Sequence, residues 1–282
     1  MKEQIKQIIA KAPNTLLARN LVREYCQARI LQFLQERRAF TSWIFHGGTA
    51  LRLLYMLPRY SEDLDFALAN PSDPDGFAKI IFAVCRSFEA EAYAVKHHKL
   101  KEHTPVMSAF IDFPGLYSEL GLSPHLTESL SIKIEVDSHP PDGGSVETSI
   151  IRRHVILNVL HYDRASLLSG KLHAVLMRPY FKGRDLYDLY WYLSDPSWPE
   201  PNLHFLNEAL HQTNWQGPEV TSTNWARQVI KRLEGVDWPK AVDDVRPLIE
   251  REAELGLLTR ESVMKLLEAR MGSRLQFTTK KR

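Results

Sequence analysis

Two aspartates one residue apart, Asp63 and Asp65, are the side chains of this sequence best suited to metal chemistry. In a β-strand both carboxylates would point to the same face, because alternate residues of a strand share a face. Such a pair can bind Mg²⁺ or Mn²⁺, which prefer oxygen ligands and usually also take substrate phosphates. Such a pair can equally well face solvent without a bound ion. The surrounding elements therefore decide between a metal site and an ordinary acidic surface.

A glycine turn lies one short helix before the aspartates. Gly47, Gly48 and Thr49 follow a short apolar strand and precede an amphipathic helix predicted over residues 50–57. Backbone N–H groups at a glycine turn and at a helix N-terminus bind phosphate. We therefore expect the two glycines and the Thr49 hydroxyl to bind the phosphates of a nucleotide.

A later segment supplies a candidate third carboxylate. Residues 131–137 alternate between apolar and charged side chains and predict a strand with Lys133, Glu135 and Asp137 on one face. Glu135 is predicted to bind metal and to help activate the attacking oxygen, since a two-metal site needs several converging carboxylates. Asp137 competes for this role, and either carboxylate can instead pair with Lys133.

Two cations are candidates for neutralising phosphate charge. Arg59, with Ser61, precedes the aspartates and is predicted to contact the nucleotide, although a surface cation explains Arg59 equally well. Lys171 lies on a helix predicted over residues 163–177 and is predicted to pair with the triphosphate as a point charge. A solvated lysine is the alternative for this residue.

The helix after Lys171 carries three further charged candidates. Arg184, Asp185 and Asp188 fall in the segment RDLYDLYWYL, and the two aspartates, three residues apart, share a helix face. They are predicted to orient Lys171 or to contact the base and ribose. An ion pair that only joins two helices is the alternative.

The elements around these residues predict an α+β fold with a mixed β-sheet, flanking helices and a helical C-terminal region. We expect one domain over residues 1–160 and a second, helical domain over residues 161–282 that contributes Lys171 and Asp185 or Asp188 to the site. The expected helices before the site and within the sheet region are residues 14–38 and 77–90. The expected later strands are residues 92–99, 106–113 and 131–137, with one or two more in 146–160.

Composition excludes several classes of protein. The chain has 282 residues, of which 44% are hydrophobic and 25% charged, and a net charge of +2, so it is an ordinary globular protein without a strong overall electrostatic partner. Its two cysteines have no metal-ligand spacing, and no signal peptide or membrane span is recognisable, so a reduced, cytoplasmic protein is expected.

The sequence lacks the motifs of the commonest hydrolases, dehydrogenases and ATPases. The sequence has no HExxH motif, no GxSxG elbow, no GxGxxG fingerprint and no P-loop, and its histidines, His46 among them, have no zinc-site spacing. Basic residues do occur beside aromatic residues, as expected for an RNA surface, although a Tyr/Trp run at helical spacing also fits a buried core. These are Arg152, Arg153, Lys182, Arg184, Lys231, Arg232 and the tail Lys280–Arg282, near Tyr180, Phe181, Tyr187, Tyr190, Trp191 and Tyr192.

Five segments in a fixed order carry a resemblance to a known family. They are Gly47–Thr49, Arg59–Phe66, Ile132–Asp137, Gly170–Ala174 and Arg184–Tyr190. Through them the chain resembles the AbiEii/AbiGii toxin family, which includes MenT-type toxins and belongs to the DNA polymerase β-like nucleotidyltransferases. The resemblance implies a nucleotidyltransferase fold, NTP and Mg²⁺ as substrate and cofactor, and a toxin encoded with an antitoxin that acts in abortive phage infection.

The resemblance also implies roles for individual residues. By the motif match, Gly48 and Thr49 bind phosphate, Asp63 and Asp65 bind metal, and Lys171 with Asp185 or Asp188 completes the site. Thr49 stands where many relatives have serine, which keeps the hydroxyl. The expected reaction is transfer of a nucleoside monophosphate to a hydroxyl, with the tRNA 3′ end as acceptor. The alternatives are a protein Ser, Thr or Tyr hydroxyl as acceptor, phosphotransfer, and a protein that only binds NTP.

Overall fold

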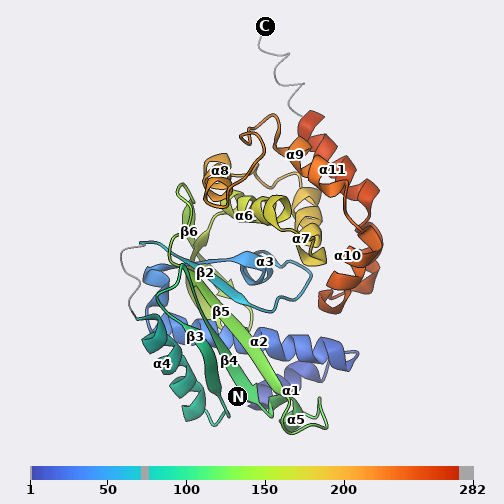
Figure 1. The fold of residues 1–282 in the computed structure, drawn as a ribbon. Coiled ribbons are helices and arrows are strands. Elements are labelled where there is room, and N and C mark those ends of the chain that lie inside the picture. The colour runs from blue at the N-terminus through green and yellow to red at the C-terminus, as the bar shows by residue number, and fades with distance from the viewer. Residues whose placement is uncertain (1, 71–75, 273–282) are drawn as a thin grey trace. The chain divides into compact units, whose positions relative to one another are not determined.

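The computed structural model describes residues 2–70 and 76–272 (Figure 1). The basic tail Lys280–Arg282 therefore lies outside the described residues. The chain divides into two compact units, Met1–Pro140 with Val146–His161 and Pro141–Ser145 with Tyr162–Arg282. The first unit contains the β-sheet, and the second is helical.

Within the described residues, seven strands form one mixed sheet in the order β3-β4-β5-β2-β1-β7-β6. β2 runs parallel to β5 and β1 parallel to β7, whereas the pairs β1–β2, β3–β4 and β4–β5 are antiparallel. This confirms the predicted α+β class with a mixed sheet. The strands are β1 (Trp43–His46), β2 (Leu64–Leu68), β3 (Lys96–Lys101), β4 (Val106–Pro114), β5 (Ser129–Asp137), β6 (Val146–Arg152) and β7 (Ile156–Tyr162).

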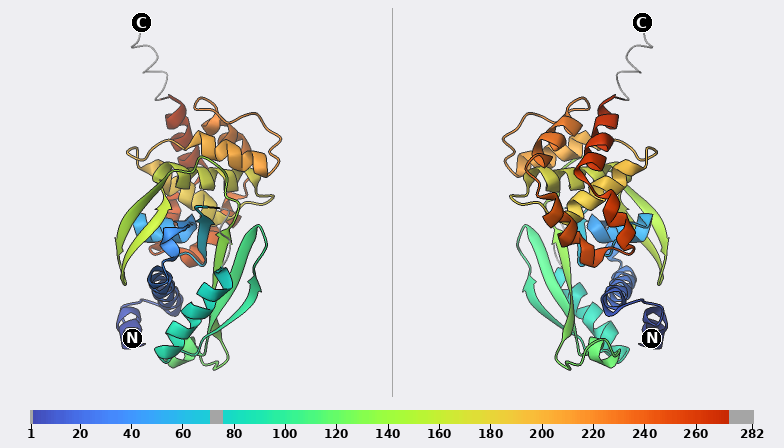
Figure 2. Two further views of the ribbon diagram at one scale, coloured as in Figure 1. Left: turned by 90° about the vertical axis from the view of Figure 1, so that its left-hand side faces the viewer. Right: turned by 90° about the vertical axis from the view of Figure 1, so that its right-hand side faces the viewer.

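At β5 the sheet has one apolar face and one polar face, because the sequence of that strand alternates. In β5 the even-numbered residues, such as Ile134 and Val136, are fully buried, while the odd-numbered residues are partly exposed. Helices α2 (Thr15–Glu36) and α4 (Phe77–Ala90) lie on the same side of β3 and β4 (Figure 2). Their apolar side chains share one core with the buried face, as in the edge contact between Phe33 and Phe88.

Local sequence signals explain where the main helices of the first unit begin. Asn14 precedes α2, and its side chain accepts a hydrogen bond from the Leu17 N–H, as an N-cap residue does. α3 begins at the glycine turn that follows β1. The other elements of this unit are α1 (Lys2–Ile9), α3 (Gly47–Tyr55), α5 (Leu116–Glu119) and a 3₁₀ turn (Ala39–Thr41).

The second unit is built from helices. Asp163 caps α6 by accepting a hydrogen bond from the Ser166 N–H, and the Gly183 N–H at the start of α7 donates to Asp244 of α10 over 2.7 Å. No helix of the described residues is long and apolar enough to cross a membrane. The helices are α6 (Arg164–Met177), α7 (Gly183–Ser194), α8 (Leu203–Gln212), α9 (Trp225–Leu233), α10 (Trp238–Val245) and α11 (Arg260–Gly272), with 3₁₀ turns Arg246–Leu248 and Glu252–Leu257.

Candidate active site

The glycine turn packs directly against the segment that carries the aspartates. Gly47 has a φ of +79°, and a Cβ added to it would lie 2.3 Å from Asp65 Oδ2. A Cβ on Gly48 would lie 2.7 Å from Arg59 Nη2 and 2.8 Å from Ser61 Oγ. Only residues without a side chain allow this approach. The structure therefore brings together five of the residues that the sequence singles out.

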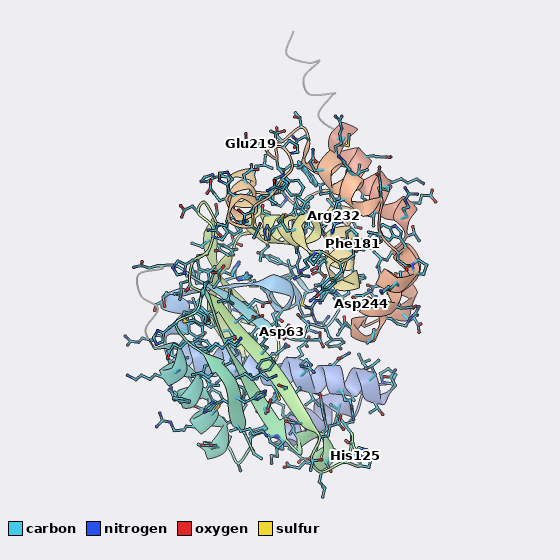
Figure 3. The ribbon with its side chains drawn as sticks, in the orientation of Figure 1. Asp63, His125, Phe181, Glu219, Arg232 and Asp244 are labelled. Atoms are coloured by element: carbon cyan, nitrogen blue, oxygen red, sulfur yellow. The ribbon has the colours of Figure 1, made fainter. Side chains whose placement is uncertain are left out.

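Thr49 anchors the start of α3 to the backbone that leads into β2. Its hydroxyl donates a hydrogen bond to the Asp63 carbonyl oxygen over 2.5 Å, and the residue is fully buried. Thr49 thus helps to fix where Asp63 (labelled in Figure 3) enters the site. Its contact with phosphate stays a prediction.

We expect a Thr49→Val variant to be less stable by about 1–2 kcal/mol, because it loses one buried hydrogen bond, and to have a higher KM for NTP, because the bond that fixes Asp63 is lost. Thr49→Ser keeps the hydroxyl and should resemble the wild type. Steady-state kinetics with varied NTP, together with the midpoint of thermal unfolding, would check this. A valine variant with wild-type values of both would show that this bond is dispensable.

Asp63 and Asp65 flank the buried Leu64, and Asp65 is paired with Glu135 across β2 and β5. Leu64 and Phe66 are buried, while Asp63 and Asp65 on either side of Leu64 are partly exposed, so the aspartates share a face as predicted from the alternation. Asp63 lies one residue before β2 rather than within it. In the parallel pairing of β2 and β5, Asp65 is directly opposite Glu135, so these two carboxylates lie on the same face of the sheet.

The two competing carboxylates of β5 have different partners. Glu135 Oε1 lies 2.7 Å from Lys133 Nζ, whereas Asp137 Oδ1 accepts a hydrogen bond from the His139 N–H over 2.9 Å. Since Glu135 is opposite Asp65, it is the better placed of the two, although it would have to leave Lys133 to bind an ion. On the other side of Asp65, the opposite residue is His46 of β1, which sequence reasoning set aside.

The donor set fits a hard divalent cation. Among the described residues, no group of three or more His, Cys, Asp or Glu side chains is arranged to hold a metal ion. Mg²⁺, however, is usually bound by one or two carboxylates plus the phosphates of its substrate, rather than by a cage of protein ligands. Asp63 and Asp65 supply oxygen donors on one face beside a turn suited to phosphate, which matches that requirement.

Arg59 is not a surface residue. Only 1% of it is exposed, and Nη1 donates to the Tyr60 carbonyl oxygen over 2.8 Å. The alternative interpretation of Arg59 as a surface cation is therefore wrong. Ser61 is also buried, and its carbonyl oxygen accepts a hydrogen bond from Gln27 of α2. These two hydrogen bonds hold the loop before β2 in place at Arg59 and Ser61, the residues that lie against Gly48.

A buried charge cluster that the sequence did not reveal holds α3. Glu24 of α2 pairs with Arg52 of α3 over 2.5 Å and with Arg153 over 2.7 Å, and it is 2.9 Å from His154 Nε2. Burial by itself would raise the pKa of Glu24. The His154 hydrogen bond and the charges of Arg52 and Arg153 outweigh it and lower that pKa to about 2. The carboxylate is therefore charged at neutral pH.

In the second unit, Lys171 of α6 is paired with the aspartates of α7. Its Nζ lies 2.7 Å from Asp188 Oδ2 and 3.8 Å from Asp185 Oδ1, and Arg178 also pairs with Asp185. Both aspartates are buried, whereas Arg184 is partly exposed. The structure brings Lys171, Asp185 and Asp188 together, as expected if the aspartates orient the lysine. Such a pair also joins two helices, so the catalytic role stays a prediction.

The aromatic run of α7 belongs mainly to the core of the second unit. Tyr187 and Tyr192 are 1% and 2% exposed, which fits the core interpretation of that run rather than an RNA surface. Arg232 of α9 lies with its guanidinium 4.5 Å from the centroid of the Phe181 ring, and its Nη2 donates to the Arg178 carbonyl oxygen (Figure 3). Arg232, one of the basic residues considered for an RNA surface, therefore packs within the second unit.

Comparison with known proteins gives one family and several similar folds. The family model described as nucleotidyl transferase AbiEii toxin, type IV toxin–antitoxin system, matches residues 29–266. JHP933 from Helicobacter pylori is similar at 18% identity, over 93% of this chain and 95% of that chain, with a TM-score of 0.57. MenT4, a nucleotidyltransferase toxin from Mycobacterium tuberculosis, is similar at 13% identity, over 96% of this chain and 88% of that chain, with a TM-score of 0.54. No curated protein sequence matches.

Proposed function

Because this chain belongs to the AbiEii family of nucleotidyltransferase toxins from type IV toxin–antitoxin systems, we propose that it transfers a nucleoside monophosphate from an NTP to the 3′-terminal hydroxyl of tRNA. The family makes the chain a toxin-type nucleotidyltransferase and implies an NTP donor and a cognate antitoxin. The tRNA acceptor, the need for Mg²⁺ or Mn²⁺, a cytoplasmic site of action and a role in abortive phage infection are parts of the proposal.

The packing of the glycine turn against the carboxylate segment carries this proposal. Gly47 leaves room for Asp65, and Gly48 leaves room for Arg59 and Ser61, so a phosphate-binding turn and oxygen ligands adjoin one another. Phosphoryl and nucleotidyl transfer depend on positioned phosphates and neutralised charge rather than on a protein nucleophile. This arrangement suits that chemistry.

In the proposed reaction the acceptor oxygen bonds to the α-phosphorus while the bond from that phosphorus to pyrophosphate breaks. Asp63 and Asp65 would hold the divalent cation, which when bound neutralises phosphate charge and polarises the oxygens it contacts. Glu135, opposite Asp65, accepts the proton of the attacking hydroxyl. The backbone of Gly47 and Gly48 binds the triphosphate, with Thr49 fixing the start of the helix.

Lys171, in the second unit, is proposed as a further cation for phosphate charge. Asp188, 2.7 Å from its Nζ, orients the lysine, with Asp185 as a more distant partner at 3.8 Å. Arg184 is proposed to contact the nucleotide. These roles rest on the family's motif and on the pairing within this unit.

Incubation with each α-³²P-labelled NTP and MgCl₂ tests the function. We expect label on intact tRNA and none on tRNA whose 3′-terminal diol has been oxidised with periodate. The same incubation with cell protein in place of tRNA, and with γ-labelled NTP, separates the alternatives. Label on protein would favour a protein hydroxyl as acceptor, γ-label on either acceptor would favour phosphotransfer, and NTP binding without any product would favour a nucleotide-binding protein.

A further inference from the structure

The polar face of the sheet continues from the carboxylates into a basic and aromatic region. One row of directly paired residues runs from Asp65 through Glu135 of β5 and Ser108 of β4 to Lys101 of β3. Paired residues of adjacent strands share a face, so Lys101 lies on the same face as the aspartates. This region belongs to the first unit and begins at the site itself.

The neighbouring row on this face contains a stack of rings. Lys133 of β5 is opposite Phe110 of β4, which is opposite His98 of β3. The His98 and Phe110 rings stack with their centroids 5.0 Å apart and their planes at 19°. Asp112 Oδ2 lies 3.0 Å from His98 Nδ1, although that nitrogen makes no hydrogen bond among the described residues, and 39% of the His98 side chain remains exposed. An exposed ring offers a face on which another ring can stack.

Lysines surround this stack. The Nζ atoms of Lys99 and Lys133 lie 5.3 and 5.9 Å from the Phe110 centroid, and Lys96, Lys99 and Lys101 are exposed along β3. The pairing register shifts between His98 and Lys101, and Lys99 has a φ of +51°. The pairing of β3 is therefore irregular at Lys99, which lets the Lys99 side chain lie over Phe110 instead of on the opposite face.

Lysines on an edge strand have an ordinary explanation, which is that they prevent edge-to-edge aggregation. That explanation requires only charge at the edge of β3. It does not require the stacked His98 and Phe110 rings, nor a pairing row that ends on Glu135 and Asp65. Stacking rings beside lysines are the features that bind single-stranded nucleic acid, where bases stack and phosphates pair.

We propose that this face binds the single-stranded 3′ end of the acceptor RNA, with a base stacked on His98 and the backbone phosphates against the lysines. We call it the strand platform, and it consists of Lys96, His98, Lys99, Lys101, Phe110 and Lys133. The inference rests on the proposed function in taking RNA as the acceptor. Lys133 is paired with Glu135, but the positive charge of Lys96, Lys99 and Lys101 complements a polyanion and is unsuited to a neutral peptide segment.

The test measures RNA binding without catalysis. Fluorescence anisotropy of a labelled 12-nucleotide single-stranded RNA, without NTP, gives Kd as a function of salt. For Lys99→Ala/Lys101→Ala we expect a Kd raised about tenfold and a log–log salt slope reduced by about 1.4, which corresponds to two lost phosphate contacts. His98→Ala should raise Kd about tenfold through lost stacking, and His98→Phe should restore it. The KM for NTP should not change.

A matched control removes the same charge elsewhere. Lys79 and Arg86 are exposed on α4, and Lys79→Ala/Arg86→Ala should leave Kd and the salt slope at wild-type values. If the platform variants behave like this control, the lysines serve only the sheet edge and the proposal is wrong. It is also overturned if the platform variants raise KM for a protein acceptor while RNA binding is unchanged. Because binding is measured without turnover, absent transfer activity would count against the proposed function alone.

Discussion

Replacing Asp65 with asparagine should lower the rate of nucleotide transfer by about 1,000-fold or more without unfolding the protein. The substitution keeps the shape that packs against Gly47 but removes the negative charge that we propose holds the cation. Loss of such a ligand removes several kcal/mol of charge stabilisation, and about 4 kcal/mol corresponds to about 1,000-fold in rate. Asp63→Asn should behave similarly.

The pair on β5 supplies the matched control for this prediction. Asp137→Asn keeps an oxygen that can accept the His139 N–H bond, so its activity should stay near that of the wild type. Glu135→Gln, opposite Asp65, should lower kcat by about 100-fold, as expected for loss of a general base. Rates come from label incorporation at saturating NTP, and circular dichroism verifies the fold. Equal losses in the Asp137 and Glu135 variants would refute the assignment of Glu135.

Most elements of the first unit could be predicted from the sequence because their signals are local. The apolar stripe of residues 77–90 predicts α4 with the bounds that the structure has, and the helix predicted over residues 14–38 is α2, Thr15–Glu36. The predicted strand 92–99 begins too early, since β3 covers Lys96–Lys101 and Ala92 has a φ of +60° in the turn after α4. The helix predicted over 50–57 begins at Gly47, because the turn itself forms its first residues.

The residues of the site also fall into those that local sequence patterns reveal and those that only the structure reveals. Asp63, Asp65 and the glycine turn are close in sequence, so alternation and turn chemistry could reveal them. The Glu24 cluster could not be found by any local pattern, because the partners of Glu24 lie 28 to 130 residues from it along the chain. In sequence, Glu24 is one charged residue in a long helix. Only the structure shows that Glu24 is buried and paired with Arg52, Arg153 and His154.

That cluster leads to the prediction with the largest effect on stability. Arg52 joins Glu24 to the loop before the site, since its Nη1 donates to the Leu57 carbonyl oxygen over 2.8 Å and its guanidinium lies 4.4 Å from the Tyr60 ring centroid. Glu24→Ala would leave Arg52 buried without this carboxylate. Breaking a buried pair from one side costs about 3–5 kcal/mol, which is a large part of the stability of a typical domain.

Unfolding in guanidinium chloride would measure the loss of unfolding free energy. Hydrogen exchange on peptides from α2 and α3 would show whether the loss is located at these helices. Glu91→Ala is the matched control, because Glu91 also pairs with an arginine of α2, Arg29, over 2.5 Å, but is about one-fifth exposed. We expect its cost to be about 1 kcal/mol, as for other solvent-accessible pairs. Similar losses in the two variants would show that burial of Glu24 does not set its contribution.

The same cluster should make the first unit sensitive to acid. The pKa of Glu24 is about 2 in the folded protein, against 4.5 ordinarily, so the unfolded chain binds its proton first as pH falls. The stabilisation is therefore complete above about pH 4.5 and is lost as the pH falls from there towards 2. The difference corresponds to about 3 kcal/mol. In Glu24→Gln, which cannot titrate, unfolding free energy should decline less steeply over this range. A wild-type slope in that variant would mean that other carboxylates cause the acid sensitivity.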